Sequence, residues 1–147
     1  MMISDTLQKQ IIEAMKAKDS VRVSTLRMLS SELKNAKIDK GSDLTEEEEL
    51  KVVQKEAKKR KDSIESYDKA GRSELAESEK EELAILQEYL PEELSDDELS
   101  KLIDEAVRET GASSVQDMGK VIGIVIGKAK GAADGKKVAE MVKGKLQ

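Results

Sequence analysis

The feature that most limits the possible folds is the scarcity of proline, since Pro91 is the only proline in 147 residues. Proline removes a backbone donor and breaks helices, so a chain with a single proline can form long uninterrupted helices. The apolar residues are mainly Leu, Val, Ile, Ala and Met, and Phe and Trp are absent. Aliphatic residues of this kind suit the packing of helix against helix. We therefore predict an all-α fold.

Apolar residues recur at helical spacing along the chain, and residues that favour helix ends separate the runs. Two capping boxes, Thr45–Glu48 and Ser95–Glu98, predict helix starts. The other helices are expected to start at Ser4, Asp19, Ser73, Ser113 or Ser114, and Asp134, and ends are expected near Lys18, Lys40, Lys69, Pro91 and Gly111. Pro91 and the capping box that follows it mark a boundary near residue 93. We therefore predict two parts, an N-terminal helical bundle, residues 1–92, and a C-terminal three-helix domain, residues 93–147.

The sixth of these segments is ambiguous, because Val121–Ile126 is rich in β-branched residues that favour strands. We predict a helix, since the sequence offers no second convincing strand to pair with it. A helix that is apolar all round is expected to lie buried in the middle of the small bundle.

Glycines fall at every fourth residue of this segment, at Gly119, Gly123, Gly127 and Gly131. In a helix they would form one smooth stripe, and each would cost about 1 kcal/mol relative to alanine. The favoured interpretation is close packing by a neighbouring helix. The alternative is a surface where a ligand or an RNA phosphate approaches the backbone.

The net charge of −5 argues against indiscriminate nucleic-acid binding, but the charge is unevenly distributed. Residues 113–147 carry seven lysines and three acids, a net charge of +4. Lys128, Lys130 and Lys136 flank the expected turn before the last helix, where helix-start amide groups favour phosphate. Asp134 could occupy those amide groups itself as a cap. Residue types alone therefore favour a solvated basic face over a phosphate site.

Two further basic groups are interpreted as structural. The run Lys58–Lys61 spreads around a helix, and acids at helical spacing are expected to form ion pairs with it. Arg22 and Arg27 are expected to pack their stems beside apolar residues and to pair with acids of the third and fourth helices.

The chain contains no histidine and no cysteine. This removes the usual general base, the commonest metal ligand and every thiolate nucleophile. Glu46–Glu49 is interpreted as the first turn of a helix, where the helix dipole favours acids, and not as a metal site. Gly127–Lys128 lacks the other residues of a phosphate-binding loop. We predict no catalytic site, no metal and no cofactor.

The first ten residues lack the apolar centre of a signal peptide. No apolar run approaches the roughly 18 residues of a membrane span. We therefore expect a cytoplasmic protein that does not cross a membrane.

Several segments, taken together, form a pattern specific enough to indicate a protein family: Arg22–Leu29, Lys58–Ile64, Glu88–Ser95, Thr110–Ser114 with Asp117–Val121, and Lys128–Lys136. In this order, and over nearly the whole chain, they resemble the GatB/YqeY family. The resemblance implies an N-terminal helical bundle followed by a three-helix C-terminal unit. In this family the same region forms the tail of the B subunit of glutamine-dependent aspartyl/glutamyl-tRNA amidotransferase, where it helps to hold the tRNA. The kinase and transamidase chemistry lies in other domains and subunits.

The resemblance implies that Lys128, Lys130 and Lys136 contact the tRNA backbone, with Lys120 as a weaker candidate. Gly127 stands where the family commonly has proline, which changes helix stiffness near this edge. We therefore expect a non-catalytic accessory module that binds tRNA. One alternative is an adaptor that docks on amidotransferase or aminoacyl-tRNA synthetase subunits. A second, a carbon–nitrogen ligase that takes its amide nitrogen from glutamine, is disfavoured because no glutaminase nucleophile or nucleotide-binding loop is present.

Overall fold

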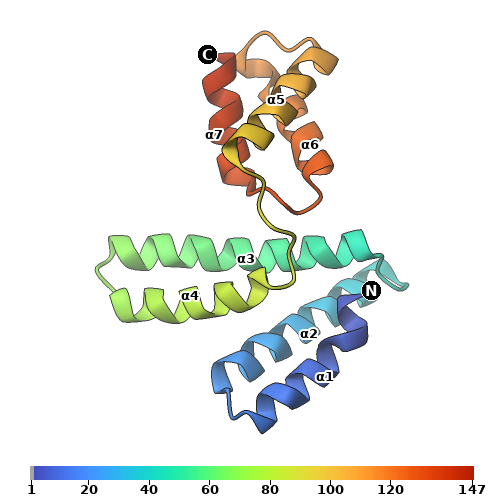
Figure 1. Cartoon of the computed structure of the whole chain (residues 1–147), viewed down its shortest axis with the longest axis vertical. Coiled ribbons are helices and arrows are strands. Elements are labelled where there is room, and N and C mark those ends of the chain that lie inside the picture. Colours follow the sequence, from blue (N-terminus) through green and yellow to red (C-terminus); the bar gives the residue numbers. More distant parts are fainter. Residues whose placement is uncertain (1) are drawn as a thin grey trace. The chain divides into compact units, whose positions relative to one another are not determined.

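The computed structural model describes residues 2–147, and every regular element in this range is a helix (Figure 1). The predicted all-α fold is confirmed. The elements of residues 2–147 are α1 (Ile3–Lys16), α2 (Ser20–Lys40), α3 (Glu46–Lys69), α4 (Ser73–Gln87), α5 (Asp96–Thr110), the 3₁₀ helix η1 (Val115–Asp117), α6 (Met118–Ala129) and α7 (Gly135–Leu146). The chain divides into two compact units, the first ending at Leu90 and the second comprising Pro91–Gln147.

The N-terminal unit is built from two helical hairpins, α1 with α2 and α3 with α4 (Figure 1). Helix α2 joins them, because it packs against both α3 and α4. Leucines dominate the core, which burial of apolar surface stabilises. The core residues are Leu7, Ile11, Leu26, Leu29, Leu33, Val53 and Leu86.

The first helix begins differently from the prediction. Helix α1 starts at Ile3, so Ser4 lies inside the helix and not at its N-cap. Met2 occupies the cap position and has no side chain that could cap. The carboxylate of Glu49 on α3 replaces the missing cap, because its two oxygens accept hydrogen bonds from the backbone N–H groups of Ile3 and Ser4 at 2.7 and 3.2 Å. The N-terminus of α1 is thereby tied to the second hairpin.

Local signals determine most other helix ends. The side chain of Asp19 accepts a hydrogen bond from the backbone of Arg22, and the full capping box between Thr45 and Glu48 is present. The end of the fourth helix is an exception: α4 ends at Gln87, before the expected stop at Pro91. The residues between them form tighter turns with bonds to the third preceding carbonyl, consistent with the rule that a residue before proline avoids helical geometry.

The basic run on α3 forms the expected ion pairs, and Arg60 also reaches α4. Lys59 and Arg60 both pair with Glu56, with N–O distances of 3.4 and 3.2 Å. The Arg60 guanidinium also lies 3.7 Å from Glu82 and 4.0 Å from Glu79. Its side chain is only 13% exposed. Arg60 is therefore a structural ion-pair centre between two helices.

The two arginines of α2 have different partners. Arg22 pairs with Glu88 at the end of α4 at 2.6 Å, as expected, and this hydrogen bond raises the pKa of Arg22. For Arg27 the expectation of an acidic partner is wrong. Its guanidinium donates to the sulfur of Met15 at 3.6 Å, because the neighbouring helix is α1 and not the acidic second hairpin.

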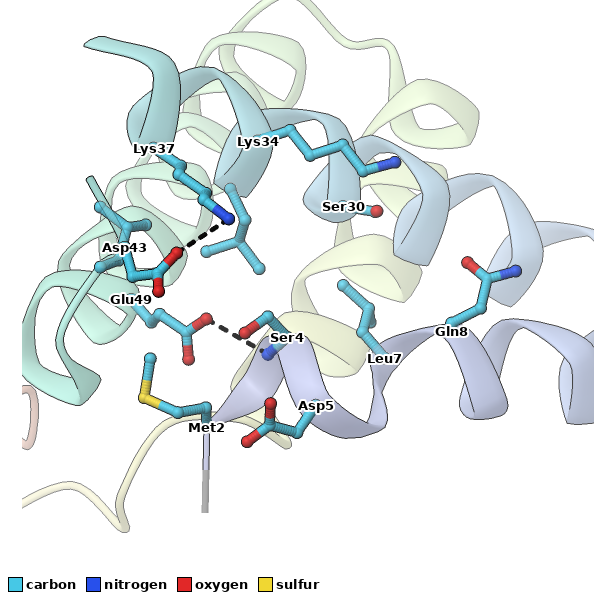
Figure 2. Close-up of a pocket in the computed structure, with 12 residues that line it drawn as sticks. Met2, Ser4, Asp5, Leu7, Gln8, Ser30, Lys34, Lys37, Asp43 and Glu49 are labelled. Carbon is cyan, nitrogen blue, oxygen red and sulfur yellow. Dashed lines mark hydrogen bonds and ion pairs between the residues drawn. The ribbon is translucent and has the colours of Figure 1, made fainter. Parts of the chain in front are cut away.

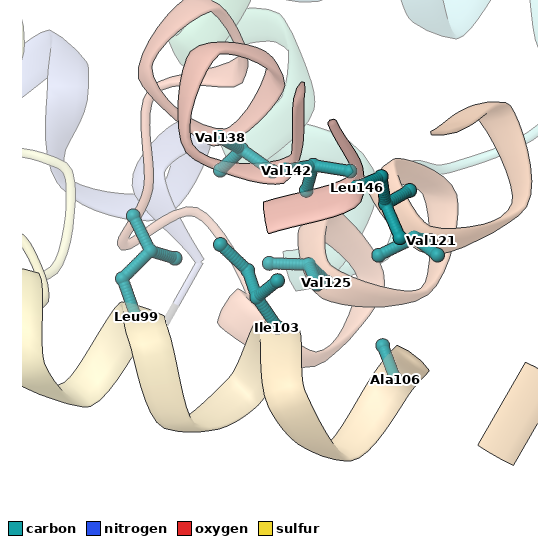
Figure 3. Packing of buried hydrophobic residues seen from close by; sticks show 8 residues of the cluster. All are labelled: Leu99, Ile103, Ala106, Val121, Val125, Val138, Val142 and Leu146. Carbon is teal, nitrogen blue, oxygen red and sulfur yellow. The ribbon is translucent and has the colours of Figure 1, made fainter. Parts of the chain in front are cut away.

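The C-terminal unit packs α5, α6 and α7 around one apolar core (Figure 3). Val121–Ile126 lies within α6, so the prediction of a helix is confirmed against its local strand propensity. The helix starts later than expected: Ser114 precedes the turn η1, and α6 begins at Met118. The buried side chains are Leu99, Ile103, Ala106, Val121, Val125, Val138, Val142 and Leu146.

The expectation that α6 is buried all round is wrong. Its buried residues, Val121, Val125 and Ala129, form a single stripe. Ile126 is 39% exposed. The reason is that a three-helix unit offers α6 two partners, α5 and α7, which cover only one side of a helical cylinder. The opposite side of α6 is open.

Candidate nucleic-acid interface

Three of the four candidate lysines surround the turn between α6 and α7. Lys128 is in the last turn of α6, and Lys130 is its C-cap, with a left-handed φ of +48°. Lys136 is the second residue of α7. Lys120 stands apart in the first turn of α6, about 12 Å along the helix axis from Lys128. The helix geometry therefore separates Lys120 from the other three.

Lys128 is held by an acid of the same unit. Its Nζ atom lies 2.7 Å from Oε1 of Glu109 on α5. An RNA phosphate would have to compete with this carboxylate. The contribution of Lys128 to a polyanion site is therefore smaller than its position in the sequence indicates.

The start of α7 is capped by its own aspartate, the possibility raised by the sequence. Asp134 is the N-cap, and its carboxylate accepts a hydrogen bond from the backbone N–H of Lys136 at 3.4 Å. A negative side chain already lies at the end of the helix where a phosphate would bind. The helix-start amide groups of α7 are therefore a poor phosphate site.

Acids of α5 also neutralise two lysines of α7. Lys145 pairs with Asp104 at 2.5 Å and donates to Ser100, while Lys137 forms an ion pair with Asp96. This contact raises the pKa of Lys137. The acidic stretch before residue 112 could have indicated such pairing, because it directly precedes the basic stretch in the sequence.

Lys120, Lys130 and Lys143 remain uncompensated. All three are exposed, and none has a carboxylate partner within residues 2–147. The sequence had no signal that separates these lysines from Lys128, because the difference depends on which side chains α5 places nearby. Lys143 was missed as a candidate.

The glycines of α6 are exposed, so the interpretation that a neighbouring helix packs on them is wrong. Gly119, Gly123 and Gly127 lie on the side of the helix opposite Val121 and Val125. A Cβ atom built on any of these glycines would meet nothing within 4 Å. The helix backbone is therefore directly accessible along this stripe.

A charged residue borders one side of the glycine stripe, and an apolar residue borders the other. At 100° per residue, Lys120 lies beside Gly123 and Gly127 on one side, and Ile126 lies on the other. An open backbone surface with a free cation at its border can accept a bulky polyanion at close range. We call Gly119, Gly123, Gly127, Lys120 and Lys130 the open α6 face.

Residues 2–147 contain no group of three or more acidic, histidine or cysteine side chains arranged to hold a metal ion. Among the same residues, no helix combines the length and apolar character that spanning a membrane requires.

Related proteins occur in fungi. An uncharacterized protein of Schizosaccharomyces pombe is 35% identical over 89 residues, which are 60% of this chain and 72% of that protein. Altered inheritance of mitochondria protein 41 of Lachancea thermotolerans is 44% identical over 85 residues, 57% of this chain and 46% of that protein. The protein of the same name in Pyrenophora tritici-repentis is 31% identical over 128 residues, 84% of this chain and 71% of that protein. The match thus spans less than half of the Lachancea protein and about 70% of the other two.

A family model described as Yqey-like protein matches residues 4–146. The match covers both helical units and confirms the family expected from the motifs. This chain belongs to the YqeY-like protein family.

Proposed function

We propose that this protein is a non-catalytic accessory module that binds tRNA through the open α6 face. The observation that carries the proposal is the exposed glycine stripe with uncompensated lysines at its border, Lys120 beside the glycines and Lys130 at the C-cap of the helix. Because no side chains stand above the stripe, a phosphate backbone could approach α6 closely. The two ammonium groups would then neutralise phosphates at that edge.

The kind of recognition follows from the side chains available. The chain has two tyrosines and no other aromatic residue, so stacking on bases would contribute little. Binding would read the shape and charge of a folded RNA more than its base sequence. The resemblance to the tail of the amidotransferase B subunit supports tRNA as that RNA.

An electrophoretic mobility assay with total tRNA tests the proposal, in about 50 and about 200 mM salt. The wild type should bind at the lower salt and lose affinity steeply at the higher. The double variant Lys120→Gln/Lys130→Gln should bind about three- to tenfold more weakly and show a smaller salt dependence. Absence of wild-type binding at the lower salt would rule out the proposal.

The control removes the same charge elsewhere. Lys51 and Lys55 on α3 are exposed and have no carboxylate partner within residues 2–147, so Lys51→Gln/Lys55→Gln should leave tRNA affinity within about twofold of the wild type. The single variant Lys128→Gln should have a smaller effect than Lys130→Gln, because Glu109 already neutralises Lys128. Equal losses in the α3 control would indicate a general charge effect and contradict a site on α6.

A second candidate function is an adaptor that docks on amidotransferase or aminoacyl-tRNA synthetase subunits. The exposure of Ile126 beside the glycine stripe favours it, because aliphatic surface is more useful for a protein partner than for RNA. Affinity purification before and after nuclease treatment discriminates the two functions. Recovery of synthetase or amidotransferase subunits that survives nuclease and is lost in Ile126→Glu would favour the adaptor.

A further inference from the structure

The first hairpin carries an exposed face that the proposed RNA site does not use. Ile12 and Met15 are three residues apart on α1, so their side chains are neighbours on one side of that helix. Four residues of α2 follow one another at spacings of four, three and four, which places them on one stripe. We call this surface the α1–α2 seam, made of Ile12, Met15, Val23, Arg27, Ser30 and Lys34.

Two pockets lie along the seam, one towards each end. A pocket of about 560 Å³ is lined by Met15, Val23 and Arg27 among others. A second pocket, of about 450 Å³, lies towards the start of α1, where Ser30 and Lys34 of α2 face Gln8 of α1 (Figure 2). Arg27, which lines the first pocket, and Ser30, which lines the second, are about one helical turn apart on α2, so the two depressions follow each other and outline a shallow groove along the seam.

Apolar groups are exposed on this groove. Met15 is 50% and Ile12 is 44% exposed, and both are among the most exposed large apolar side chains of the described chain. The buried leucines Leu7 and Leu33 line the second pocket. Exposed aliphatic side chains bordered by polar residues are typical of protein-binding surfaces.

The cations of the seam lack acidic partners. The Arg27 guanidinium donates to the sulfur of Met15, and neither Arg27 nor Lys34 has a carboxylate partner in the described chain. Two of the three acids that line the second pocket are already engaged: Asp43 pairs with Lys37 at 2.8 Å, and Glu49 binds the start of α1. The third, Asp5, is a single negative charge against Arg27 and Lys34. The groove therefore presents positive charge together with aliphatic surface.

We propose that the α1–α2 seam binds an acidic amphipathic helix of a partner protein. Its apolar side would cover Met15 and Ile12, and its carboxylates would pair with Arg27 and Lys34. From Val23 to Lys34 the groove runs for about 17 Å, the length of about three helical turns. Laying an apolar helix face into a groove is a common mode of recognition. RNA is the disfavoured occupant, because the seam offers aliphatic groups and no aromatic side chain for stacking.

Two synthetic peptides of about 15 residues test this with the full chain. Both carry the same leucine pattern of an amphipathic helix, and their polar positions are glutamate in one and lysine in the other. Fluorescence anisotropy should show the glutamate peptide binding at least about tenfold more tightly than the lysine peptide. Amide NMR shifts caused by the peptide should fall on α1 and α2. No saturable binding, equal binding of both peptides, or shifts confined to other helices would overturn the proposal.

Charge reversal locates the contact. Both side chains changed in Arg27→Glu/Lys34→Glu are exposed, so the fold should persist in circular dichroism while affinity for the glutamate peptide falls at least about tenfold. The matched variant Lys51→Glu/Lys55→Glu should stay within about twofold of the wild type. A loss of tRNA affinity in Arg27→Glu/Lys34→Glu without any loss of peptide affinity would assign the seam to RNA and overturn the proposal. If tRNA does not bind at the open α6 face, the proposal for the α1–α2 seam still stands, because the seam lies in the other unit.

Discussion

The Oε1 atom of Glu49 accepts a hydrogen bond from the backbone N–H of Ile3 at 2.7 Å, across 46 residues of sequence. Glu49 is 2% exposed, yet its carboxylate is fully engaged, because Oε2 binds the next backbone N–H at 3.2 Å. A helix N-terminus carries unsatisfied donors and a partial positive charge, and a carboxylate matches both. One side chain of the second hairpin thus completes the first helix.

Replacing Glu49 with alanine should therefore destabilise the protein. The change leaves the first donors of α1 without a partner and opens a small buried space. We expect a loss of about 1–2 kcal/mol in the free energy of unfolding, the usual cost of losing an N-cap. Urea unfolding of the full chain measures it. Glu47→Ala, at an exposed position of the same helical turn, should change stability by less than about 0.5 kcal/mol. Equal effects of the two variants would contradict a capping role for Glu49.

The sequence could predict those parts of the fold that neighbouring residues determine. The capping box of Thr45 and Glu48 closes within four residues, so both partners are visible in the sequence. The cap that Glu49 provides for α1 depends on tertiary packing, and the sequence by itself therefore predicts Ser4 as the N-cap. Val121–Ile126 shows the reverse effect, since apolar packing inside the three-helix unit overrides its strand propensity.

The candidate site was predictable only in outline. The basic character of the last two helices is a property of composition, and the sequence shows it directly. That Lys128 meets Glu109 while Lys130 does not meet an acid depends on the crossing of α5 and α6. The exposure of Gly123 likewise depends on how many helices surround α6. Which lysines lie near an acid and which do not depends on tertiary packing, and the helical pattern of the sequence does not encode that packing.

Arg60 should be a major source of stability in the first unit. Its guanidinium is 3.2 Å from the buried carboxylate of Glu56, which is 3% exposed. Arg60→Met keeps much of the apolar stem but leaves Lys59 as the remaining cation beside that carboxylate. We expect the free energy of unfolding to fall by about 3 kcal/mol, the lower end of the range for breaking a buried ion pair. Thermal and urea unfolding report it. The double variant Arg60→Met/Glu56→Leu should recover part of the lost stability. A double variant that is less stable than Arg60→Met would contradict this explanation.

Glu82 should make the first unit less stable as pH rises. Burial and the neighbouring Glu79 raise the pKa of Glu82 above its ordinary value of 4.5, although Arg60 partly opposes the shift. The folded state then holds the proton more tightly than the unfolded state does, so the free energy of unfolding falls as pH increases through this range. Glu82→Gln removes the titration. Urea unfolding at about pH 4 and pH 7 should show the variant gaining stability relative to the wild type at the higher pH. A relative loss there would reverse the sign and refute the interpretation, and Glu81→Gln serves as the exposed control.

Glycines at two positions of the second unit should respond to alanine in opposite ways. Gly123 has helical geometry and open space where a Cβ would stand, so Gly123→Ala should stabilise the protein by up to about 1 kcal/mol through helix propensity. Gly111 ends α5 with a φ of +68°, so Gly111→Ala should cost about 1–2 kcal/mol from left-handed strain. Urea unfolding of both variants distinguishes the two effects.

A larger side chain at Gly123 separates the effect on stability from the effect on tRNA binding. Gly123→Gln should also be at least as stable as the wild type, because glutamine is a good helix former and nothing occupies the space above the helix. If RNA approaches the open α6 face, the longer side chain should weaken tRNA binding by about three- to tenfold, whereas Gly123→Ala should weaken it less. A variant that is more stable but binds less well cannot be explained by partial unfolding. If Gly123→Gln binds tRNA as tightly as the wild type, the phosphates do not come close to this stripe, and the lysines would have to act without it.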